Sequence, residues 1–516
     1  MGCVCDSHMG SGKDVVIGID SSTTATKAIA WKGDGAIAGI GRSPIPLASP
    51  ASGRYEQNPE DWWSSACHAL RDLLRQVAPE RVVAVAISNQ RETFAPLGPQ
   101  GDPVRPAIMW LDQRCEQEVA WLAGRVGKDE IHRISGKPPD MAPVAYRIAW
   151  MLRWETELFR ATAMFVDVHS YLAWRLTGAF RTSWASADPL GLFDMERKAW
   201  SPEVMAALEL REEQLPQLAA PGSAVGAVSE SAAAATGLVP GTLVVAGGGD
   251  GQAAGLGVNA LVPWRAYLNL GTAVVSGTYS REYRTGAAWR TMGSCSGEGY
   301  YFETSLRAGT FLLDWFVRHL CQAREGDCGI YERLEAEAAS APIGSDGLLT
   351  LPYCGAVMTP YWDPHARGCF VGLTASHRLG HIYRSLLEGI ALEQTLVTGM
   401  IEEQTKVGVR EFVAIGGGAS SDLWCQIVAD ASGKVVRRSR TVEASSLGAA
   451  ICAAVGAGWF PSAAAAAEAM CGEITRETEP RPQHSARYAE LLGIYRELYP
   501  QLRDTFSKLA RFTARG

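Results

Sequence analysis

The sequence predicts an α/β protein with two large domains. The chain has 516 residues, more than a single hydrophobic core usually serves. Apolar stretches of strand type alternate with helical stretches along its whole length, which is typical of the α/β class. No apolar run is long enough to span a membrane, so no membrane partner is expected. The formal net charge of −7 indicates no surface for polyanions, so no nucleic-acid partner is expected.

The two ends of the chain are set apart from the folded domains. Residues 1–13 read as a leader that includes the remnant of an expression tag, and residues 501–516 as a C-terminal tail. The twelve cysteines are scattered without paired metal-binding spacing, which favours a reducing, cytoplasmic location. A homodimer is compatible with the sequence.

The first motif is a hairpin over residues 15–31. Two apolar strands flank a turn rich in hydroxyl groups, with Asp20 near the end of the first strand and Lys27 near the start of the second. Hydroxyls, backbone amides and one lysine can hold phosphates, and a carboxylate can hold hydrated Mg²⁺. The alternative is an ordinary solvated turn, because aspartate, serine and threonine are common turn residues. The expected phosphate ligands are Ser22, Thr23, Thr24 and Lys27.

The second motif is a strand, a glycine turn and a helix that opens on Asp250, in residues 244–255. It is followed by a strand that ends in Gly271 and Thr272. A carboxylate at the edge of a sheet can accept a proton from a hydroxyl, and a Gly-Thr turn can offer backbone amides and a hydroxyl to a phosphate. The two features together indicate phosphoryl transfer to an alcohol.

A third motif follows at residues 412–426, where a strand runs into three glycines and then a helix. Residues without side chains let a flat ring lie against the backbone. Close strand–helix packing without a ligand explains one such turn equally well. The interpretation of this segment as a binding site for a flat ring therefore depends on the order of all three motifs.

These motifs, in this order, resemble the FGGY family of carbohydrate kinases from about residue 14 to about residue 500. Residues 367–377 and 387–389 also resemble the family's C-terminal signature. The resemblance implies two actin-like (ribonuclease H-like) ATPase domains that flank a deep catalytic cleft. It places the N-terminal domain at 14–258 and the C-terminal domain at 259–500, with ATP and Mg²⁺ as cofactors.

The resemblance also implies a role for each motif residue. Asp250 is the expected general base, and Asp20 and Asp250 are expected to hold hydrated Mg²⁺. Gly309 is expected to line the nucleotide cleft. The residues expected around the β- and γ-phosphates are Ser22, Thr23, Thr24, Lys27, Gly271 and Thr272. The residues expected around adenosine are Gly417, Gly418, Ala419 and Asp422.

The acceptor is expected to be a small sugar or polyol. Gln90, Arg91 and Glu92 end an apolar strand and match the pocket of the family's glycerol kinases. Trp110 is expected to stack on carbon atoms, and Gln252 to join the same pocket. Asp112 has two readings, a pocket residue or the N-cap of the next helix. A surface ion pair is the alternative for Arg91 and Glu92.

The chain departs from the family at three positions. Arg147 stands where a lysine is usual, and Val144 where a small polar residue or proline is usual. Ala142 falls where glycerol kinases carry a pocket tyrosine. A wider pocket favours a ketopentose such as xylulose, or a pentitol, with glycerol as the alternative substrate. A further alternative is an ATP-driven conformational protein of the actin or chaperone type, which would need no acceptor pocket beside Asp250.

Overall fold

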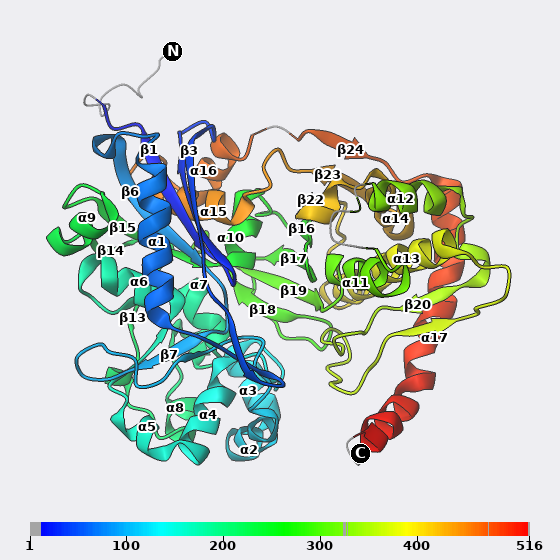
Figure 1. The fold of residues 1–516 in the computed structure, drawn as a ribbon, viewed down its shortest axis with the longest axis horizontal. Coiled ribbons are helices and arrows are strands. Elements are labelled where there is room, and N and C mark those ends of the chain that lie inside the picture. The colour runs from blue at the N-terminus through cyan, green and yellow to red at the C-terminus, as the bar shows by residue number, and fades with distance from the viewer. Residues whose placement is uncertain (1–11, 324–326, 328, 473, 514–516) are drawn as a thin grey trace.

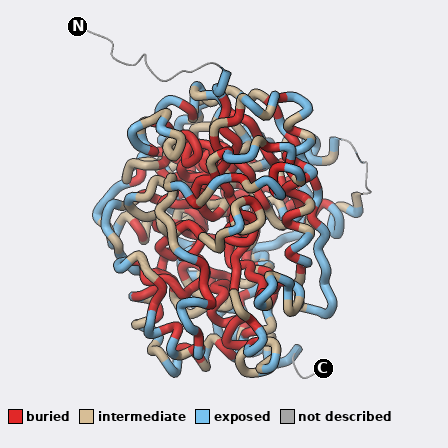
Figure 2. Tube along the Cα trace, turned by 90° about the vertical axis from the view of Figure 1, so that its left-hand side faces the viewer, coloured by how far each residue is buried: buried red, intermediate tan, exposed pale blue. Residues whose placement is uncertain are grey.

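The computed structural model describes residues 12–323, 327, 329–472 and 474–513. The predicted leader at residues 1–13 therefore lies almost entirely outside the described residues. Two large β-sheets lie side by side, with helices on their faces (Figure 1). Buried residues fill the interior of the molecule, and exposed segments form the outer shell (Figure 2). Among the described residues, no helix combines the length and hydrophobicity that crossing a membrane requires.

The first sheet is built from the N-terminal half. Its strands β15, β6 and β1 are parallel, and β2 and β3 continue from β1 as antiparallel hairpins. The apolar residues of these central strands are buried on both faces, as expected for a sheet covered by helices on each side. In spatial order the strands are β14 (Ala224–Ala227), β15 (Leu243–Gly249), β6 (Val82–Asn89), β1 (Val15–Ser21), β2 (Ala25–Trp31) and β3 (Ile37–Pro44).

The second sheet repeats this topology. Strands β16, β22 and β23 are parallel, and β17 and β19 extend from β16 in antiparallel pairs. The order β19-β17-β16-β22-β23-β24 thus matches β3-β2-β1-β6-β15-β14, and β18 is the one extra strand. The strands are β18 (Arg290–Gly293), β19 (Tyr300–Leu306), β17 (Val274–Ser280), β16 (Arg265–Leu270), β22 (Glu411–Ile415), β23 (Val435–Arg438) and β24 (Arg476–Thr478). The duplicated sheet confirms the expected pair of actin-like domains.

Helices cover both sheets. On the first sheet, α1 (Pro59–Leu73) packs against β2 and β3, and α6 (Val168–Thr177) packs against α1 and β6. On the second, α13 (Leu379–Thr405) lies against β20 and β19. The helices around α13 are α11 (Thr310–Trp315), α12 (Ile330–Ser340), α14 (Asp422–Ser432) and α17 (Pro482–Thr513). Residues 501–513, predicted as a tail, continue helix α17.

Two helices from late in the chain belong spatially to the first sheet. Helices α15 (Ala444–Gly456) and α16 (Ala463–Met470) lie beside the N-terminal strands (Figure 1). Leu447 and Ile451 share one core cluster with Val16 and Val245. Helix α15 also packs closely on α10 (Asp250–Gly257). The chain therefore returns to its first half before it ends.

A smaller sheet extends the first half below the main sheet (Figure 1). Its strands are β4 (Ala48–Ala51), β5 (Arg54–Gln57), β8 (Ala107–Ile108), β7 (Phe94–Leu97) and β9 (Met164–Asp167). The helices near it are α2 (Glu116–Val126), α3 (Lys128–Ser135), α4 (Val144–Trp154), α5 (Thr156–Ala161) and α8 (Pro202–Ala207). Trp110 lies just after strand β8 of this sheet, whereas Ala142 lies between the nearby helices α3 and α4.

Several short elements lie outside these sheets and helix layers. They are β10 (Arg181–Ser183), α7 (Trp184–Ala187), β11 (Phe193–Asp194), β12 (Ala199–Trp200), β13 (Gln217–Ala219), α9 (Glu230–Thr236), β20 (Leu349–Leu351) and β21 (Cys369–Val371).

Candidate active site

The carboxyl ends of three parallel strands bring the predicted chemical groups together. In the register of the sheet, Asp20 on β1 lies beside Ser88 on β6, and Asn89 on β6 lies beside Gly249 on β15. The residues that follow each strand therefore meet at one edge, which is where open α/β sheets bind ligands. Residues 247–249, expected as a glycine turn, instead finish β15, which passes straight into helix α10. Their lack of side chains serves close packing, because a Cβ at Gly247 would lie 2.1 Å from the carbonyl oxygen of Ile87.

Asp250 opens helix α10 at this edge. Its Oδ1 accepts a hydrogen bond of 2.8 Å from the Gly251 N–H and lies 3.0 Å from Nε of Arg91. The side chain keeps 40% of its surface exposed, while that of Arg91 is 8% exposed. An exposed carboxylate held by a buried guanidinium can accept a proton from a bound hydroxyl.

Asp20 is the second carboxylate of the edge. Its Oδ1 accepts a hydrogen bond of 3.1 Å from Ser88 Oγ. Burial, followed by the nearby Asp250 carboxylate, raises the pKa of Asp20 to about 7. Two carboxylates that repel each other suit a divalent cation, and Mg²⁺ is commonly held by one or two carboxylates together with water. The described residues contain no cluster of three or more metal-ligating side chains, so Asp20 and Asp250 would have to be supplemented by water and phosphate.

A network of ion pairs continues from Arg91 into the second half. Glu303 on β19 lies 2.8 Å from Nη1 of Arg91 and 2.7 Å from Nη2 of Arg290. Arg290 on β18 also lies 2.6 Å from Glu92. Burial opposes ionisation of Glu303, but the two guanidinium groups together lower its pKa to about 2. Arg290 and Glu303 were not predicted from the sequence. The available signal was a single charged residue within the otherwise uncharged strand β19.

Arg147 fixes the backbone of the predicted acceptor pocket. Its Nη2 donates to the carbonyl oxygens of Glu92 at 2.5 Å and Ala142 at 2.6 Å, and its Nη1 donates to Met141 at 2.9 Å. Glu92 has a φ of 50°, a left-handed conformation that non-glycine residues seldom adopt. The fully buried Arg147 therefore holds a strained residue and the loop before α4 together.

The two predicted pocket glutamines are buried and engaged with other protein groups. Gln90 Nε2 donates to Gln57 Oε1 at 3.0 Å. Gln252 Nε2 donates to the Ala185 carbonyl at 2.8 Å and to Asp188 Oδ1 at 3.1 Å. These hydrogen bonds give both glutamine side chains a structural role in supporting the site. Direct contact of either glutamine with an acceptor stays a prediction.

Trp110 lies between the predicted pocket and the first hairpin. Its indole Nε1 donates to Thr23 Oγ1 at 3.0 Å.

Asp112 has neither of its two predicted roles. The N-cap of α2 is Cys115, and the Asp112 side chain is buried and does not open to a pocket. It accepts from the Tyr55 N–H at 2.7 Å and pairs with Arg114 at 2.8 Å.

The two predicted phosphate turns lie at the ends of equivalent hairpins, β1–β2 and β16–β17. In the first turn, Ser22 Oγ donates to the Ala25 carbonyl at 2.8 Å, and Thr24 is exposed. Lys27 makes a bidentate contact with Glu443, with Nζ 2.8 and 2.7 Å from its two oxygens. Glu443 directly precedes α15, so the lysine expected at the phosphates is held by a residue from late in the chain.

The second turn is supported by the residues that begin α11. The Thr310 N–H donates to the Gly271 carbonyl at 2.8 Å, and the Phe311 N–H donates to Thr272 at 3.3 Å. A Cβ at Gly309 would lie 2.3 Å from the Gly271 carbonyl oxygen. Gly309 is therefore in direct backbone contact with this turn, and its place in the nucleotide cleft stays a prediction.

The residues of the expected adenosine segment lie in different environments. A Cβ on Gly417 would meet no atom within 4 Å, whereas one on Gly418 would lie 2.4 Å from the Trp424 ring and 2.9 Å from the Leu270 carbonyl oxygen. Gly417 thus borders open space, and Gly418 needs to be small for internal packing. Ala419 is buried. Asp422 pairs with Arg438 at 2.7 Å and Arg476 at 2.6 Å. Contact of any of these residues with adenosine stays a prediction.

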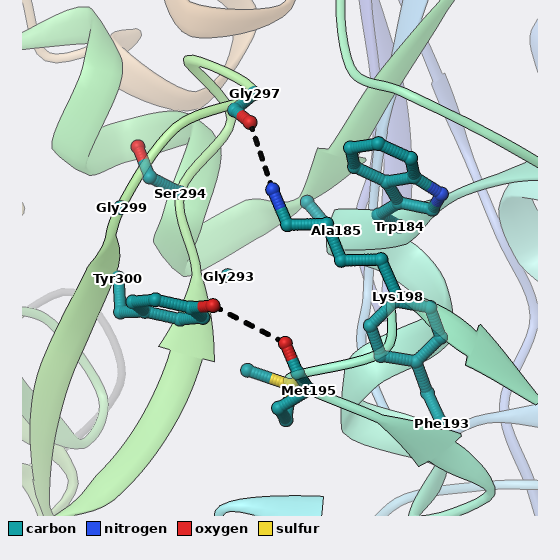
Figure 3. A pocket seen from close by; sticks show the side chains of 10 residues that line it. All are labelled: Trp184, Ala185, Phe193, Met195, Lys198, Gly293, Ser294, Gly297, Gly299 and Tyr300. Carbon is teal, nitrogen blue, oxygen red and sulfur yellow. Dashed lines mark hydrogen bonds between the residues drawn. The ribbon is translucent and has the colours of Figure 1, made fainter. Parts of the chain in front are cut away.

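A small cavity lies near the site, between helix α7 and the β18–β19 turn (Figure 3). Lys198 reaches across it to the Gly297 carbonyl at 3.4 Å, and the Tyr300 hydroxyl donates to Met195 at 3.2 Å (Figure 3). Its wall is mainly apolar and includes Trp184. The predicted phosphate and acceptor residues are all described, and none of them lines this cavity.

Comparison with known proteins covers nearly the whole chain. Residues 15–257 match the N-terminal domain, and residues 266–457 the C-terminal domain, of the FGGY family of carbohydrate kinases. A xylulose kinase of Bacillus subtilis (strain 168) is 29% identical over 502 residues, which cover 96% of this chain and 99% of the relative. The solved xylulose kinase of Rhodospirillum rubrum is 27% identical, with a TM-score of 0.88 over 96% of this chain and 100% of that chain. The solved gluconate kinase of Lactobacillus acidophilus, 24% identical, shares the fold with a TM-score of 0.90 over 96% of this chain and 99% of that chain. The protein belongs to the FGGY family of carbohydrate kinases and is a phosphotransferase that acts on a small sugar or polyol.

Proposed function

We propose that the protein transfers the γ-phosphoryl group of ATP to a hydroxyl of a ketopentose such as xylulose, or of a pentitol. The observation that carries the chemistry is the half-exposed Asp250 carboxylate, held at 3.0 Å by buried Arg91 at the edge where three parallel strands end. Family membership sets aside the alternative of an actin-type or chaperone-type conformational protein.

The proposed reaction needs a base, a bound acceptor and neutralised phosphate charge. Asp250 accepts the proton of the acceptor hydroxyl, the hydroxyl oxygen bonds to the γ-phosphorus, and the bond from phosphorus to the bridging oxygen of ADP breaks. Mg²⁺, when bound, neutralises charge on the phosphates, and Asp20 and Asp250 would hold it. The Ser22–Thr24 and Gly271–Thr272 turns would offer backbone N–H groups and hydroxyls to the phosphates.

A five-carbon acceptor is favoured by two considerations. The named relatives include xylulose kinases that match almost the full length of the chain. Ala142, which is small and largely buried, stands where the family resemblance places a tyrosine in glycerol kinases. Glycerol stays the second candidate, because the Gln90-Arg91-Glu92 run and Trp110 match the pocket of those kinases.

An acceptor screen tests the proposal. ADP release is measured with Mg–ATP and each of xylulose, xylitol, ribulose, erythritol, gluconate and glycerol, and kcat/KM values are compared. We expect xylulose or a pentitol to rank first. A tenfold advantage for glycerol would make the protein a glycerol kinase, and turnover of none of these acceptors would refute the proposal.

The variant Asp250→Asn tests the assigned base. It keeps the side-chain shape and one oxygen for Arg91, so the fold and ATP binding should persist. Turnover should fall by roughly 10²–10⁴-fold, the usual contribution of a general base. Asp194→Asn offers a control at a buried carboxylate outside the site. Turnover near that of the wild type in Asp250→Asn would remove Asp250 from the mechanism.

A further inference from the structure

The acceptor pocket proposed above is assembled from both halves of the chain. Arg91, Glu92 and Asp250 follow strands of the first sheet, whereas Arg290 and Glu303 stand on neighbouring strands of the second. Glu303 and Arg290 face each other in the β18–β19 register. Both side chains are buried and point to the same junction, where Arg290 continues to Glu92 and Glu303 continues to Arg91.

We propose that Glu303 is a positioning residue that fixes Arg91 against Asp250 and Arg290 against Glu92. Through it the second half determines the geometry of the acceptor pocket. The proposal rests on the proposed function only in taking Arg91, Glu92 and Asp250 as the groups that meet the acceptor.

The hydrogen bonds of Glu303 show why it can hold both arginines at once. Its Oε1 accepts from Arg290 Nε at 2.7 Å, and its Oε2 accepts from Arg91 Nη1 at 2.8 Å and from the Tyr267 hydroxyl at 2.7 Å. Its side chain has no exposed surface. A buried carboxylate is tolerated only when it is paired and hydrogen-bonded, and this one has a donor on each oxygen.

Arg91 depends on Glu303 for its orientation. The guanidinium uses Nε for Asp250 and Nη1 for Glu303, so the two carboxylates hold it from different sides. The glycines of the β15–α10 junction leave the space it occupies, because a Cβ at Gly249 would lie 2.6 Å from the Arg91 side chain and one at Gly251 would lie 3.0 Å from it. Without the Glu303 charge, the buried Arg91 guanidinium would turn further toward Asp250. It would then leave the position in which it can bind the acceptor.

Arg290 depends on the same carboxylate. Its Nε donates to Glu303 and its Nη1 to Glu92 at 2.6 Å. The carbonyl of Glu92 is held separately by Arg147. Glu303 therefore acts on the side chain of Glu92 through Arg290, while the backbone of Glu92 stays fixed within the first half.

The test compares Glu303→Gln with a matched control, Glu411→Gln. Glu411 is also a buried glutamate between two arginines, with Arg265 at 2.5 Å and Arg437 at 3.0 Å. It stands at the start of β22, the end of that strand opposite to the site edge. Both variants remove one buried carboxylate charge, so both should lower the melting temperature. Only Glu303→Gln should affect the acceptor.

Calorimetric titration of the full-length protein provides the readout. The probes are xylulose, or the acceptor that ranks first in the screen, and a non-hydrolysable ATP analogue with Mg²⁺. We expect Glu303→Gln to weaken acceptor binding and raise the acceptor KM at least tenfold, with affinity for the nucleotide changed less than twofold. Glu411→Gln should keep both affinities. An equal loss of acceptor affinity in the two variants, or unchanged acceptor affinity in Glu303→Gln, would overturn the proposal.

Tyr267→Phe keeps the proposal testable if Glu303→Gln fails to fold. This variant removes one hydrogen bond to Glu303 and retains the ring and both ion pairs. Acceptor KM should rise a few fold with the nucleotide KM unchanged, and an unchanged acceptor KM would count against the proposal. Failure of the proposed function is separate: a wild type that phosphorylates no acceptor in the screen refutes the function, whereas an active wild type with unaltered variants refutes only the role of Glu303.

Discussion

At the scale of residues, the environment of each side chain separates groups that the sequence presents as equivalent. Gly417 and Gly418 are neighbours in one glycine run, but only Gly417 borders open space. Likewise, the acidic side chains of the site differ in what holds them. Asp250 is half-exposed, whereas Glu303 is enclosed by arginines.

The different surroundings of Gly417 and Gly418 predict different effects for two valine variants. Gly417→Val should fold normally and weaken ATP binding about tenfold or more, because its side chain would enter the space expected for adenosine. Gly418→Val should mainly lower the melting temperature, since it would collide with Trp424. Calorimetric ATP titration and thermal unfolding check the two effects. Unchanged ATP affinity in Gly417→Val would contradict the adenosine assignment.

The surroundings of Glu393 predict that the free energy of unfolding depends on pH through a group outside the active site. It lies buried in α13, accepts hydrogen bonds of 2.7 Å from the hydroxyls of Tyr353 and Tyr495, and burial raises its pKa to about 7. Because the folded pKa is above the ordinary 4.5, its stabilising contribution is complete below about pH 4.5 and is lost as the pH rises through 7. The shift corresponds to roughly 3 kcal/mol.

The measurement is the free energy of unfolding between pH 4.5 and pH 8. Glu393→Gln keeps the shape of the side chain and cannot ionise, so the decline of stability over this range should become shallower. Glu497→Gln, at an exposed position of α17, should keep the decline of the wild type. Parallel pH profiles for all three proteins would show that Glu393 does not titrate as described.

The candidate site was predictable from sequence only where its residues lie in local motifs. Asp20 and Asp250 follow apolar strands, and glycines or hydroxyl residues mark the turns beside them. Glu303 and Arg290 have no such local pattern. Antiparallel pairing in the second sheet sets them opposite each other, and the packing of the two halves brings Glu303 to Arg91. The ion pair of Glu443 with Lys27 likewise depends on tertiary structure, because it forms only where α15 packs on the first sheet.

At the scale of elements, contacts between backbones define how α15 lies on the first half. A Cβ on Gly448 would lie 1.9 Å from the Ala253 carbonyl oxygen, and a Cβ on Gly257 would lie 2.0 Å from that of Ala444. Each of α10 and α15 thus presents a glycine to the backbone of the other. The strands and helices flanking the site were predicted from their apolar runs, but this contact depends on tertiary packing.

Two glycine-to-alanine variants test this packing. Gly448→Ala would force α10 and α15 apart and should destabilise the protein by about 3 kcal/mol, the upper end for overpacking. Gly493→Ala, in helix α17, meets no atom within 4 Å. It should stabilise by roughly 0.5–1 kcal/mol, because alanine favours helix more than glycine does. Equal chemical denaturation curves for the two variants would contradict the backbone contact.

At the scale of the whole molecule, the two phosphate turns belong to different sheets. The Ser22–Thr24 turn joins β1 and β2, and the Gly271–Thr272 turn joins β16 and β17. The duplicated order of strands was predictable only through the resemblance to a family. A nucleotide held by both turns would draw the two halves together.

Small-angle scattering tests this closure. The variant Asp250→Asn allows ATP itself to be used, because it should bind Mg–ATP and acceptor with little turnover. The radius of gyration should fall when both ligands are present, and less with either alone. Identical scattering curves with and without ligands would argue against closure as the step that assembles the site.

The position of helices α15 and α16 also has a consequence for synthesis on the ribosome. The face of the first sheet that they cover remains open until residue 470 has left the exit tunnel, although its own strands are complete by residue 249. The nascent N-terminal half therefore exposes Val16, Ile29 and Val245 while the rest of the protein is translated. The last step in the folding of the first half therefore waits for the synthesis of α15 and α16, and a fragment that stops before α15 should require a chaperone to stay in solution.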